Sequence, residues 1–240
     1  MNLFIHIKES FNSALGTLRV NKLRTFLTLL GITIGIFAII SVFTVIDSLE
    51  RTIRTSLSSL GDDILYIQKW PWTPPPGEEY AWWEYLKRPL PSYGEFRYLK
   101  DNSEMTRAVA FQVNTFRPVS YKNQAINEVA ILGISSDYEQ IRNFRYDQGR
   151  YFSSIESYQG NNVVILGFEV ARELFQGRSP LGRRVNVAGF RTYVIGVLQK
   201  EGSGLLAGGS MDEVVLVPLN FARRFIDIRR EQAGPTIIVR

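Results

Sequence analysis

The longest apolar stretch lies near the N-terminus and contains no charged residue. It runs from Thr25 to Ile46, with the sequence TFLTLLGITIGIFAIISVFTVI. At about 1.5 Å per residue, a helix of this length reaches roughly 33 Å, enough for a hydrocarbon core of about 30 Å. The alternative is a cleavable signal peptide, which has a short basic leader and an apolar run of about 7–15 residues. Here the leader has 24 residues and the exit reads Val45-Ile46-Asp47-Ser48-Leu49. The pattern therefore favours an uncleaved transmembrane helix.

A second apolar pattern precedes this segment. Apolar residues recur every three or four positions, and polar residues lie elsewhere on the helical wheel. This spacing predicts an amphipathic helix of about 18 residues within residues 1–24, lying in the inner membrane interface. Packing on a soluble partner is the alternative, and both can hold at the membrane surface. The apolar positions are Phe4, Ile7, Phe11, Leu15 and Leu18.

The membrane helix is expected to continue beyond the apolar stretch. Leu49, Ile53, Leu57 and Leu60 extend the helical spacing up to Gly61, a residue suited to a C-terminal cap. Residues 25–60 thus form a transmembrane helix with an outer stalk, and a rod from Phe26 to Leu60 would be roughly 50 Å long.

Two glycines within the span, Gly31 and Gly35, form a small-xxx-small face that permits close helix approach in lipid. Glycines are common in membrane helices, so an incidental pair is the alternative reading of this face.

Charges on the two flanks predict the orientation. Before the span, four basic residues stand against the single Glu9, whereas the exit mixes Asp47 and Glu50 with Arg51 and Arg54. The positive-inside rule therefore places the N-terminus in the cytoplasm and everything after Asp47 outside. We expect the basic residues of the leader to anchor the inner interface and to contact lipid. They are Lys8, Arg19, Lys22 and Arg24.

After Gly61 the pattern alternates short strands with short helices, which predicts an α+β outer domain. Capping boxes at Ser92-x-x-Glu95 and Ser136-x-x-Glu139 predict helix starts, the first helix running to Asn102. Further helices are expected at Phe168–Phe175 and Leu219–Ile226, and a flexible stretch at 201–210. Strands are expected at Ile64–Gln68, Val109–Val113, Phe116–Tyr121, Ile126–Ile134, Asn162–Leu166, Val185–Val187, Thr192–Leu198, Glu213–Val217 and Thr236–Val239.

The pattern of strands and helices along the chain changes near Gly149, which predicts two lobes. The first comprises residues 61–148 and 235–240, and the second, residues 149–234, is inserted into it. The last strand, Thr236–Val239, then returns to the first lobe and should lie near Ile64–Gln68. We also expect these 240 residues to be the N-terminal part of a longer protein, because the final residues, 235–240, look like the opening of a buried strand rather than a terminus.

Composition excludes several classes of chemistry. Cysteine is absent and His6 is the single histidine, so thiol catalysis, histidine-based triads and sites with several histidine ligands cannot be built. The net charge of +5 comes from scattered Lys and Arg, so no nucleic-acid partner is expected. The glycine-rich 202–209 stretch lacks the Gly-Lys-Ser/Thr of a phosphate-binding loop. Solvated charges are the simplest interpretation of the remaining clusters, so we predict no catalytic, metal or cofactor site. These clusters are Asp62-Asp63, Glu78-Glu79, Arg223-Arg224 and Arg229-Arg230.

All four tryptophans lie in one proline-rich insert, WPWTPPPGEEYAWWEYLKRPLP. Exposed aromatic rings among prolines suit a protein–protein contact or a membrane-interface belt. Packing of the loop against its own domain is the alternative. We expect these residues, Trp70, Trp72, Trp82 and Trp83, to meet a periplasmic partner.

Several ordered motifs resemble one transporter family. Asn21 to Gly35 reads NKLRTFLTLLGITIG, similar to the first membrane helix of MacB/FtsX-type ABC transporter permeases. The outer part resembles their periplasmic core domain. It carries Gly149-Arg150-Tyr151-Phe152, Val163-Val164-Ile165-Leu166-Gly167, Pro180-Leu181-Gly182-Arg183-Arg184-Val185, Tyr193-Val194-Ile195-Gly196-Val197-Leu198 and Val217-Pro218-Leu219. The tryptophan-rich insert departs from this pattern.

The resemblance implies a permease subunit of the inner (plasma) membrane with an extracytoplasmic main domain. It would form a dimer with a second permease copy and work with a separate cytoplasmic ABC ATPase, whose ATP hydrolysis moves the outer domain for export or extraction of a substrate. The resemblance also implies three more membrane helices. The alternative is a membrane-anchored periplasmic scaffold or signalling protein without transport activity.

Overall fold

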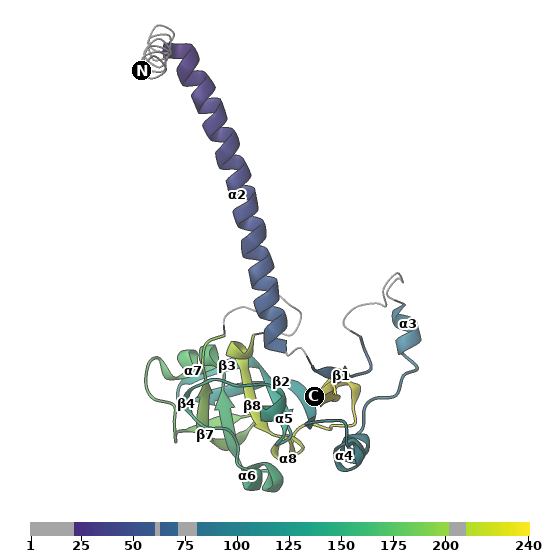
Figure 1. Ribbon diagram of the computed structural model, residues 1–240. Coiled ribbons are helices and arrows are strands. Elements are labelled where there is room, and N and C mark those ends of the chain that lie inside the picture. The colour runs from purple at the N-terminus through teal and green to yellow at the C-terminus, as the bar shows by residue number, and fades with distance from the viewer. Residues whose placement is uncertain (1–21, 61–62, 72–80, 202–209) are drawn as a thin grey trace, which may run out of the picture. The chain divides into compact units, whose positions relative to one another are not determined.

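The computed structural model describes residues 22–60, 63–71, 81–201 and 210–240 (Figure 1). By its internal contacts the chain divides into two units, Met1–Arg54 and Thr55–Arg240. The amphipathic leader, the cap at Gly61 and most of the expected flexible stretch lie outside the described residues. These three features stay predictions.

A long apolar helix, α2, runs without interruption from Lys22 to Leu60 over 39 residues, and its part up to Arg54 belongs to the first unit. The continuous helix expected from Phe26 to Leu60 is thus confirmed, with one more turn at its start. At about 1.5 Å per residue, α2 is roughly 58 Å long. Its segment Lys22–Arg51 is, by length and composition, able to cross a membrane, and the most apolar 18-residue window within it has a mean hydropathy of 2.6.

The second unit is built on one mixed sheet. Along its main path the strands are ordered β1-β9-β2-β3-β8-β5-β7-β4, and β6 pairs with both β2 and β7. The pairs β3–β8 and β5–β7 are parallel, and the others are antiparallel. The strand bounds are β1 Leu65–Ile67, β2 Val109–Tyr121, β3 Gln124–Ile134, β4 Tyr146–Gly149, β5 Val163–Leu166, β6 Arg184–Val187, β7 Phe190–Leu198, β8 Val214–Pro218 and β9 Thr236–Val239.

Because β6 bridges two strands, part of the sheet closes on itself. The pairings run from β2 through β3, β8, β5, β7 and β6 back to β2, which forms a ring. Closure of a ring removes free strand edges. β9 and β1 lie outside this ring, attached along the first half of β2, so β1 is left as an edge strand.

The long strand β2 serves both parts of the sheet. Its residues Val109–Gln112 pair with β9, whereas Val119 and Ser120 pair with β6 beyond a register shift after Arg117. Strands from both predicted lobes therefore lie in one sheet, and the division at Gly149 stays a prediction. The expected return of the last strand is confirmed, because β9 pairs antiparallel with β1.

Helices cover the sheet, and apolar side chains form two buried clusters. In one cluster Phe96 of α4 packs against Phe111 of β2, with ring centroids 5.7 Å apart. The other cluster gathers around Tyr138 of α5 and Phe152. The helices are α3 Trp82–Tyr85, α4 Tyr93–Asn102, α5 Tyr138–Ile141, α6 Ser154–Gln159, α7 Phe168–Phe175 and α8 Leu219–Ala222, with 3₁₀ turns η1 Met211–Glu213 and η2 Glu231–Ala233.

Several local expectations are confirmed. The capping box at Ser92 and Glu95 starts α4, and α7 has the expected bounds. β6 and β7 form the expected hairpin, in which Ala188 and Gly189 both have positive φ, as a tight primed turn requires.

Other expectations are wrong in detail. Val109–Val113 and Phe116–Tyr121 form one strand, β2, and α8 ends at Ala222 rather than at Ile226. The box expected at Ser136 is absent: α5 starts after Asp137 without a side-chain cap, and the Ser136 hydroxyl donates to the Asp137 carboxylate instead.

A capping box that the sequence reasoning did not single out starts α6. The Glu156 carboxylate accepts the Ser153 backbone N–H at 2.7 Å, and both its oxygens accept from the Arg150 guanidinium at 2.7 and 2.8 Å. The hydrogen bonds from Arg150 are the largest cause that lowers the pKa of Glu156 from 4.5 to about 2. The charged carboxylate thus stabilises the fold, because it is favoured in the folded state.

Replacement of Glu156 by Gln should destabilise the protein in a pH-dependent manner. Because the folded-state pKa is depressed, the stabilisation is present above about pH 5 and is lost as the pH falls toward 2. Urea unfolding of the detergent-solubilised chain should show a midpoint difference from wild type that shrinks over this range. The exposed Glu104→Gln variant serves as the control and should show no such trend. An equal midpoint difference for Glu156→Gln at pH 7 and pH 2.5 would contradict the assignment.

Candidate functional site

The candidate membrane span of α2, Lys22–Arg51, presents an apolar surface to its surroundings. Its threonine hydroxyls donate to backbone carbonyls of the preceding turn: Thr28 to Arg24 and Thr33 to Leu29, at 3.0 and 2.8 Å. Hydroxyls satisfied in this way can face lipid without an unpaired polar group. These threonine hydroxyls are therefore satisfied within the helix itself.

The two predicted packing glycines lie one turn apart on α2. A Cβ added at Gly31 or Gly35 would meet no described atom within 4 Å. The notch at these positions is open, as close approach of a second helix requires. Among the predicted interface anchors, Lys22 and Arg24 are exposed in the first turn of α2, whereas Lys8 and Arg19 lie outside the described residues.

The tryptophan-rich insert divides into an anchored part and an exposed part. Trp70 is anchored: its indole N–H donates to Glu231 at 2.8 Å, and its ring meets Tyr85 edge-on at 6.4 Å. The Lys69 ammonium bonds the other Glu231 oxygen at 3.0 Å. Hydrogen bonds from Lys69 and then Trp70 lower the pKa of Glu231. Trp70 thus fits the alternative interpretation, packing against its own domain.

Trp82 and Trp83 behave differently. They open the short helix α3, and their side chains are 53% and 57% exposed. Their rings meet edge-on at 5.9 Å, so they form one aromatic patch. Trp72 lies outside the described residues. Of the predicted aromatics, this pair is available for a partner.

An apolar groove that the sequence reasoning missed lies between the edge strand β1 and helix α4. Its volume is about 580 Å³. The sequence carries no signal for it, because residues far apart in the chain build its walls. It is lined by Ile67, Gln68, Arg88–Leu90, Pro91, Gly94, Glu95, Tyr98, Leu99 and Ile237.

The candidate charged clusters carry no catalytic arrangement in the described residues. No group of three or more His, Asp or Glu side chains there could hold a metal ion. Arg224, expected on a solvated helix face, lies beyond the end of α8 and donates to Asn162 and to the Gly160 carbonyl at 2.7 and 3.0 Å. Arg230 pairs with Asp227 at 3.2 Å. These arginines therefore hold loops in place or face solvent.

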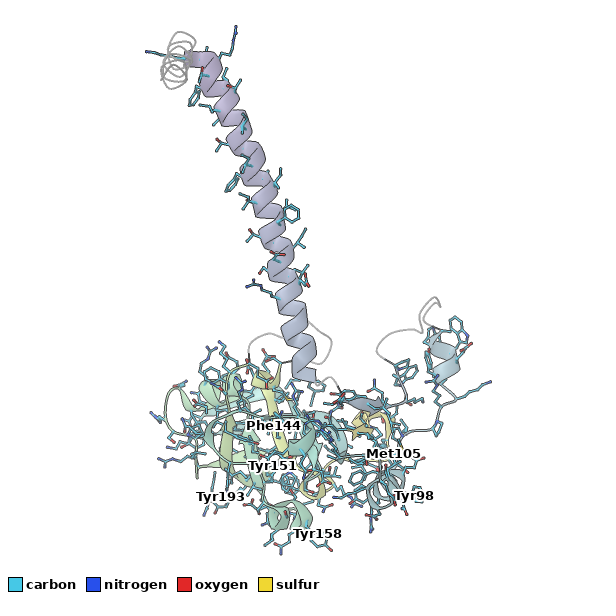
Figure 2. The ribbon with its side chains drawn as sticks, in the orientation of Figure 1. Tyr98, Met105, Phe144, Tyr151, Tyr158 and Tyr193 are labelled. Carbon is cyan, nitrogen blue, oxygen red and sulfur yellow. The ribbon has the colours of Figure 1, made fainter. Side chains whose placement is uncertain are left out.

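A cluster of tyrosines around Phe144 is also structural. Phe144 stacks with Tyr138 and Tyr151, with ring centroids 5.8 and 6.1 Å apart. Figure 2 labels Phe144 and Tyr151. Burial raises the pKa of Tyr138 to about 12 and that of Tyr151 still further. At neutral pH these phenols stay protonated and act as packing groups rather than as bases.

Comparison with known proteins agrees with this order of an apolar helix followed by a mixed sheet. A family model for the MacB-like periplasmic core domain matches residues 25–240. The chain belongs to this family.

Curated relatives of this family member are components of ABC transporters. Macrolide export ATP-binding/permease protein MacB of Bdellovibrio bacteriovorus is 28% identical over 92% of this chain and 33% of its own length. The uncharacterized ABC transporter permease YknZ of Bacillus subtilis is 28% identical over 83% of this chain and 48% of its own. Pyoverdine export protein PvdT of Pseudomonas aeruginosa is 25% identical, over 81% and 28%. The chain thus spans between about a quarter and a half of these relatives.

Solved structures show the same fold. The periplasmic region of MacB from Actinobacillus actinomycetemcomitans superposes with a TM-score of 0.58 at 16% identity, over 77% of each chain. The extracellular domain of YknZ from Gram-positive bacteria gives 0.51 at 22% identity, over 62% of this chain and 72% of that one. The MacB-like family expected from the sequence motifs is therefore confirmed.

Simultaneous replacement of Trp82 and Trp83 by Ala should leave the fold intact and remove a partner contact. Because both rings are exposed, the free energy of unfolding should change by no more than about 0.5 kcal/mol per residue. Crosslinking in intact cells from a photoreactive group at position 84 should lose its protein adducts in the double variant. The matched control, Tyr158→Ala, removes another exposed aromatic and should keep them. Unchanged adducts in the double variant would argue against the contact.

Proposed function

We propose that this chain is part of the permease subunit of a MacB/FtsX-type ABC transporter. In this proposal a separate cytoplasmic ATPase hydrolyses ATP, and the resulting movement of α2 rearranges the outer domain for export or extraction of a substrate. The family match and the transporter relatives support this assignment. The observation that carries it is the uninterrupted α2, which extends well past the span length of about 20 residues.

A rigid connection is what such a mechanism needs. Lys22–Arg51 suffices to cross the membrane, and the helix continues to Leu60, five positions before β1 begins at Leu65. A helix transmits displacement along its axis because each turn is hydrogen-bonded to the next. Four residues, 61–64, separate the end of α2 from the start of β1.

The proposed assembly contains a second permease copy, packed through Gly31 and Gly35. The open notch at these positions supports this contact. In the same proposal Lys8, Arg19, Lys22 and Arg24 face the cytoplasmic interface, where they contact anionic lipid and the ATPase. Trp82 and Trp83 face a periplasmic partner.

A membrane-anchored scaffold is the second candidate. The exposed Trp82–Trp83 patch favours it, since such a patch serves adhesion equally well. The two candidates differ in whether an ATPase accompanies the chain.

Affinity purification of the natively encoded protein from solubilised membranes should recover an ABC-class ATPase and a second, differently tagged copy. The Gly35→Leu variant should recover roughly tenfold less of the second copy, because the added side chain fills the notch. Thr33→Leu places the same leucine side chain on the opposite face of the helix and is the matched control. Purification of the chain without any ATPase would exclude the permease reading and favour the scaffold.

The proposed orientation predicts the labelling of single cysteines by a membrane-impermeant thiol reagent. The chain has no native cysteine, so each introduced thiol is unique. In intact cells Asn2→Cys should stay unlabelled until the membrane is permeabilised, whereas Met105→Cys, at a side chain 98% exposed, should react at once. The reverse pattern would overturn the orientation and the coupling mechanism with it.

A further inference from the structure

The loop that follows α8 carries four arginines within eight positions, from Arg223 to Arg230. Residues 223–229 of this loop line a hollow of about 460 Å³, within the range of roughly 300–1,000 Å³ that small-molecule sites occupy. Backbone hydrogen bonds hold the loop in a turn that continues from α8, with the Ile226 N–H donating to the Ala222 carbonyl at 2.9 Å. The hollow is therefore part of the folded domain and needs no rearrangement to form.

The positive charges around this hollow are not neutralised. Its single carboxylate, that of Asp227, forms an ion pair at 3.2 Å with Arg230, which lies outside the lining. In the part of the chain that the structure describes, Arg223, Arg224 and Arg229 form no ion pair with a carboxylate. Three exposed guanidinium groups thus line the hollow with uncompensated positive charge.

Neutral groups hold two of these side chains in place. Arg224 donates to the Asn162 side-chain oxygen and to the Gly160 carbonyl at 2.7 and 3.0 Å, which uses two of its five N–H donors. The Arg223 guanidinium lies over the Tyr93 ring, 5.3 Å from its centroid. Contact with the face of a ring positions a guanidinium without using its N–H donors. Both side chains therefore keep their charge and have donors to spare.

The hollow also has an apolar part. Phe225 and Ile228 line it and are half-buried, because they pack against the buried cluster that contains Phe221. An apolar wall beside a few polar groups is typical of a site for an organic ligand. A bare inorganic ion would leave this wall without a contact.

We propose that the hollow binds a phosphate monoester, with the phosphate among Arg223, Arg224 and Arg229 and the organic substituent against Phe225 and Ile228. Guanidinium groups suit phosphate because their planar forks donate two parallel hydrogen bonds to its oxygens. A phosphate monoester carries about −1.5 to −2 charges at pH 7, which balances three cations better than the single charge of a carboxylate does.

The size of the hollow favours a single group over a protein partner. One loop of seven residues lines it, whereas a stable protein–protein contact buries about 800 Å² on each partner. The phosphate monoester is either a soluble molecule or the headgroup of a lipid, and both present the same chemistry to the arginines.

Calorimetric titration of the protein, purified in a non-ionic detergent, with phenyl phosphate tests this proposal. Phenyl phosphate should bind, inorganic phosphate should compete with it, and benzoate should bind at least tenfold more weakly. Arg223→Gln together with Arg229→Gln should weaken the binding of phenyl phosphate at least tenfold. Arg224 is retained because its hydrogen bonds hold the loop. The matched control, Arg117→Gln with Arg178→Gln, removes the same charge from exposed positions outside the hollow and should bind like wild type.

A second arm identifies the source of the phosphate. The protein in nanodiscs of neutral lipid is mixed with phosphatidylcholine vesicles that contain or lack phosphatidic acid. Recruitment only to the vesicles with phosphatidic acid, lost in the Arg223→Gln and Arg229→Gln variant, would support the site with a lipid headgroup as its ligand. Binding of phenyl phosphate without recruitment would support it with a soluble ester.

Three results would overturn the proposal. Equal weakening in the control pair would show general attraction of anions to a basic protein. Benzoate binding as tight as that of phenyl phosphate would show a site for any anion. Absence of both phenyl phosphate binding and vesicle recruitment would show that these arginines face solvent without a ligand. None of these readouts involves an ATPase or a second copy of the chain.

Discussion

Antiparallel pairing along β2 is the constraint on which the outer domain depends. One end of this strand holds β9, which in turn holds β1, and the other end holds β6, which closes the ring. The register shift after Arg117 lies between the segment of β2 that pairs with β9 and the segment that pairs with β6, and it lets the strand bend there. If β2 lost its register, the alternation of buried and exposed side chains would invert on both sides at once.

The elements that the sequence predicted well are those whose signals are local. The apolar α2, the Ser92 capping box and the Ala188-Gly189 hairpin each follow from residues within a few positions of one another. The Ser136-x-x-Glu139 spacing looks identical to the Ser92 box, yet Asp137 adopts a helical conformation as the N-cap of α5 instead of leaving Ser136 extended as the cap. Burial of Tyr138 and Ile141 outweighs the cap there. Ring closure and the groove depend on residues far apart in the chain, and no local pattern encodes them.

The candidate site residues also divide into those with a local sequence signal and those that depend on contacts between distant residues. The glycine face and the basic flank of α2 are visible in sequence because membranes impose composition on a single helix. The four tryptophans look equivalent in sequence, whereas the structure separates Trp70, bonded to Glu231, from the exposed Trp82 and Trp83. That distinction needs η2, contributed some 160 residues later, and could not be read from the insert alone. The buried tyrosines stay protonated because burial raises their pKa values, and they act as packing groups.

The pairing of Tyr66 with Ile238 has a consequence for biosynthesis. About 170 residues separate these two partners, whereas β6 and β7 meet across a two-residue turn. Contacts between distant residues form late, because closure of a long loop costs more entropy than closure of a short one. Hairpins of the ring can therefore form while the chain is still being synthesised. The β1–β9 pair cannot form until nearly all 240 residues have been synthesised. The strand β1, which follows α2, is therefore synthesised early but pairs with β9 late.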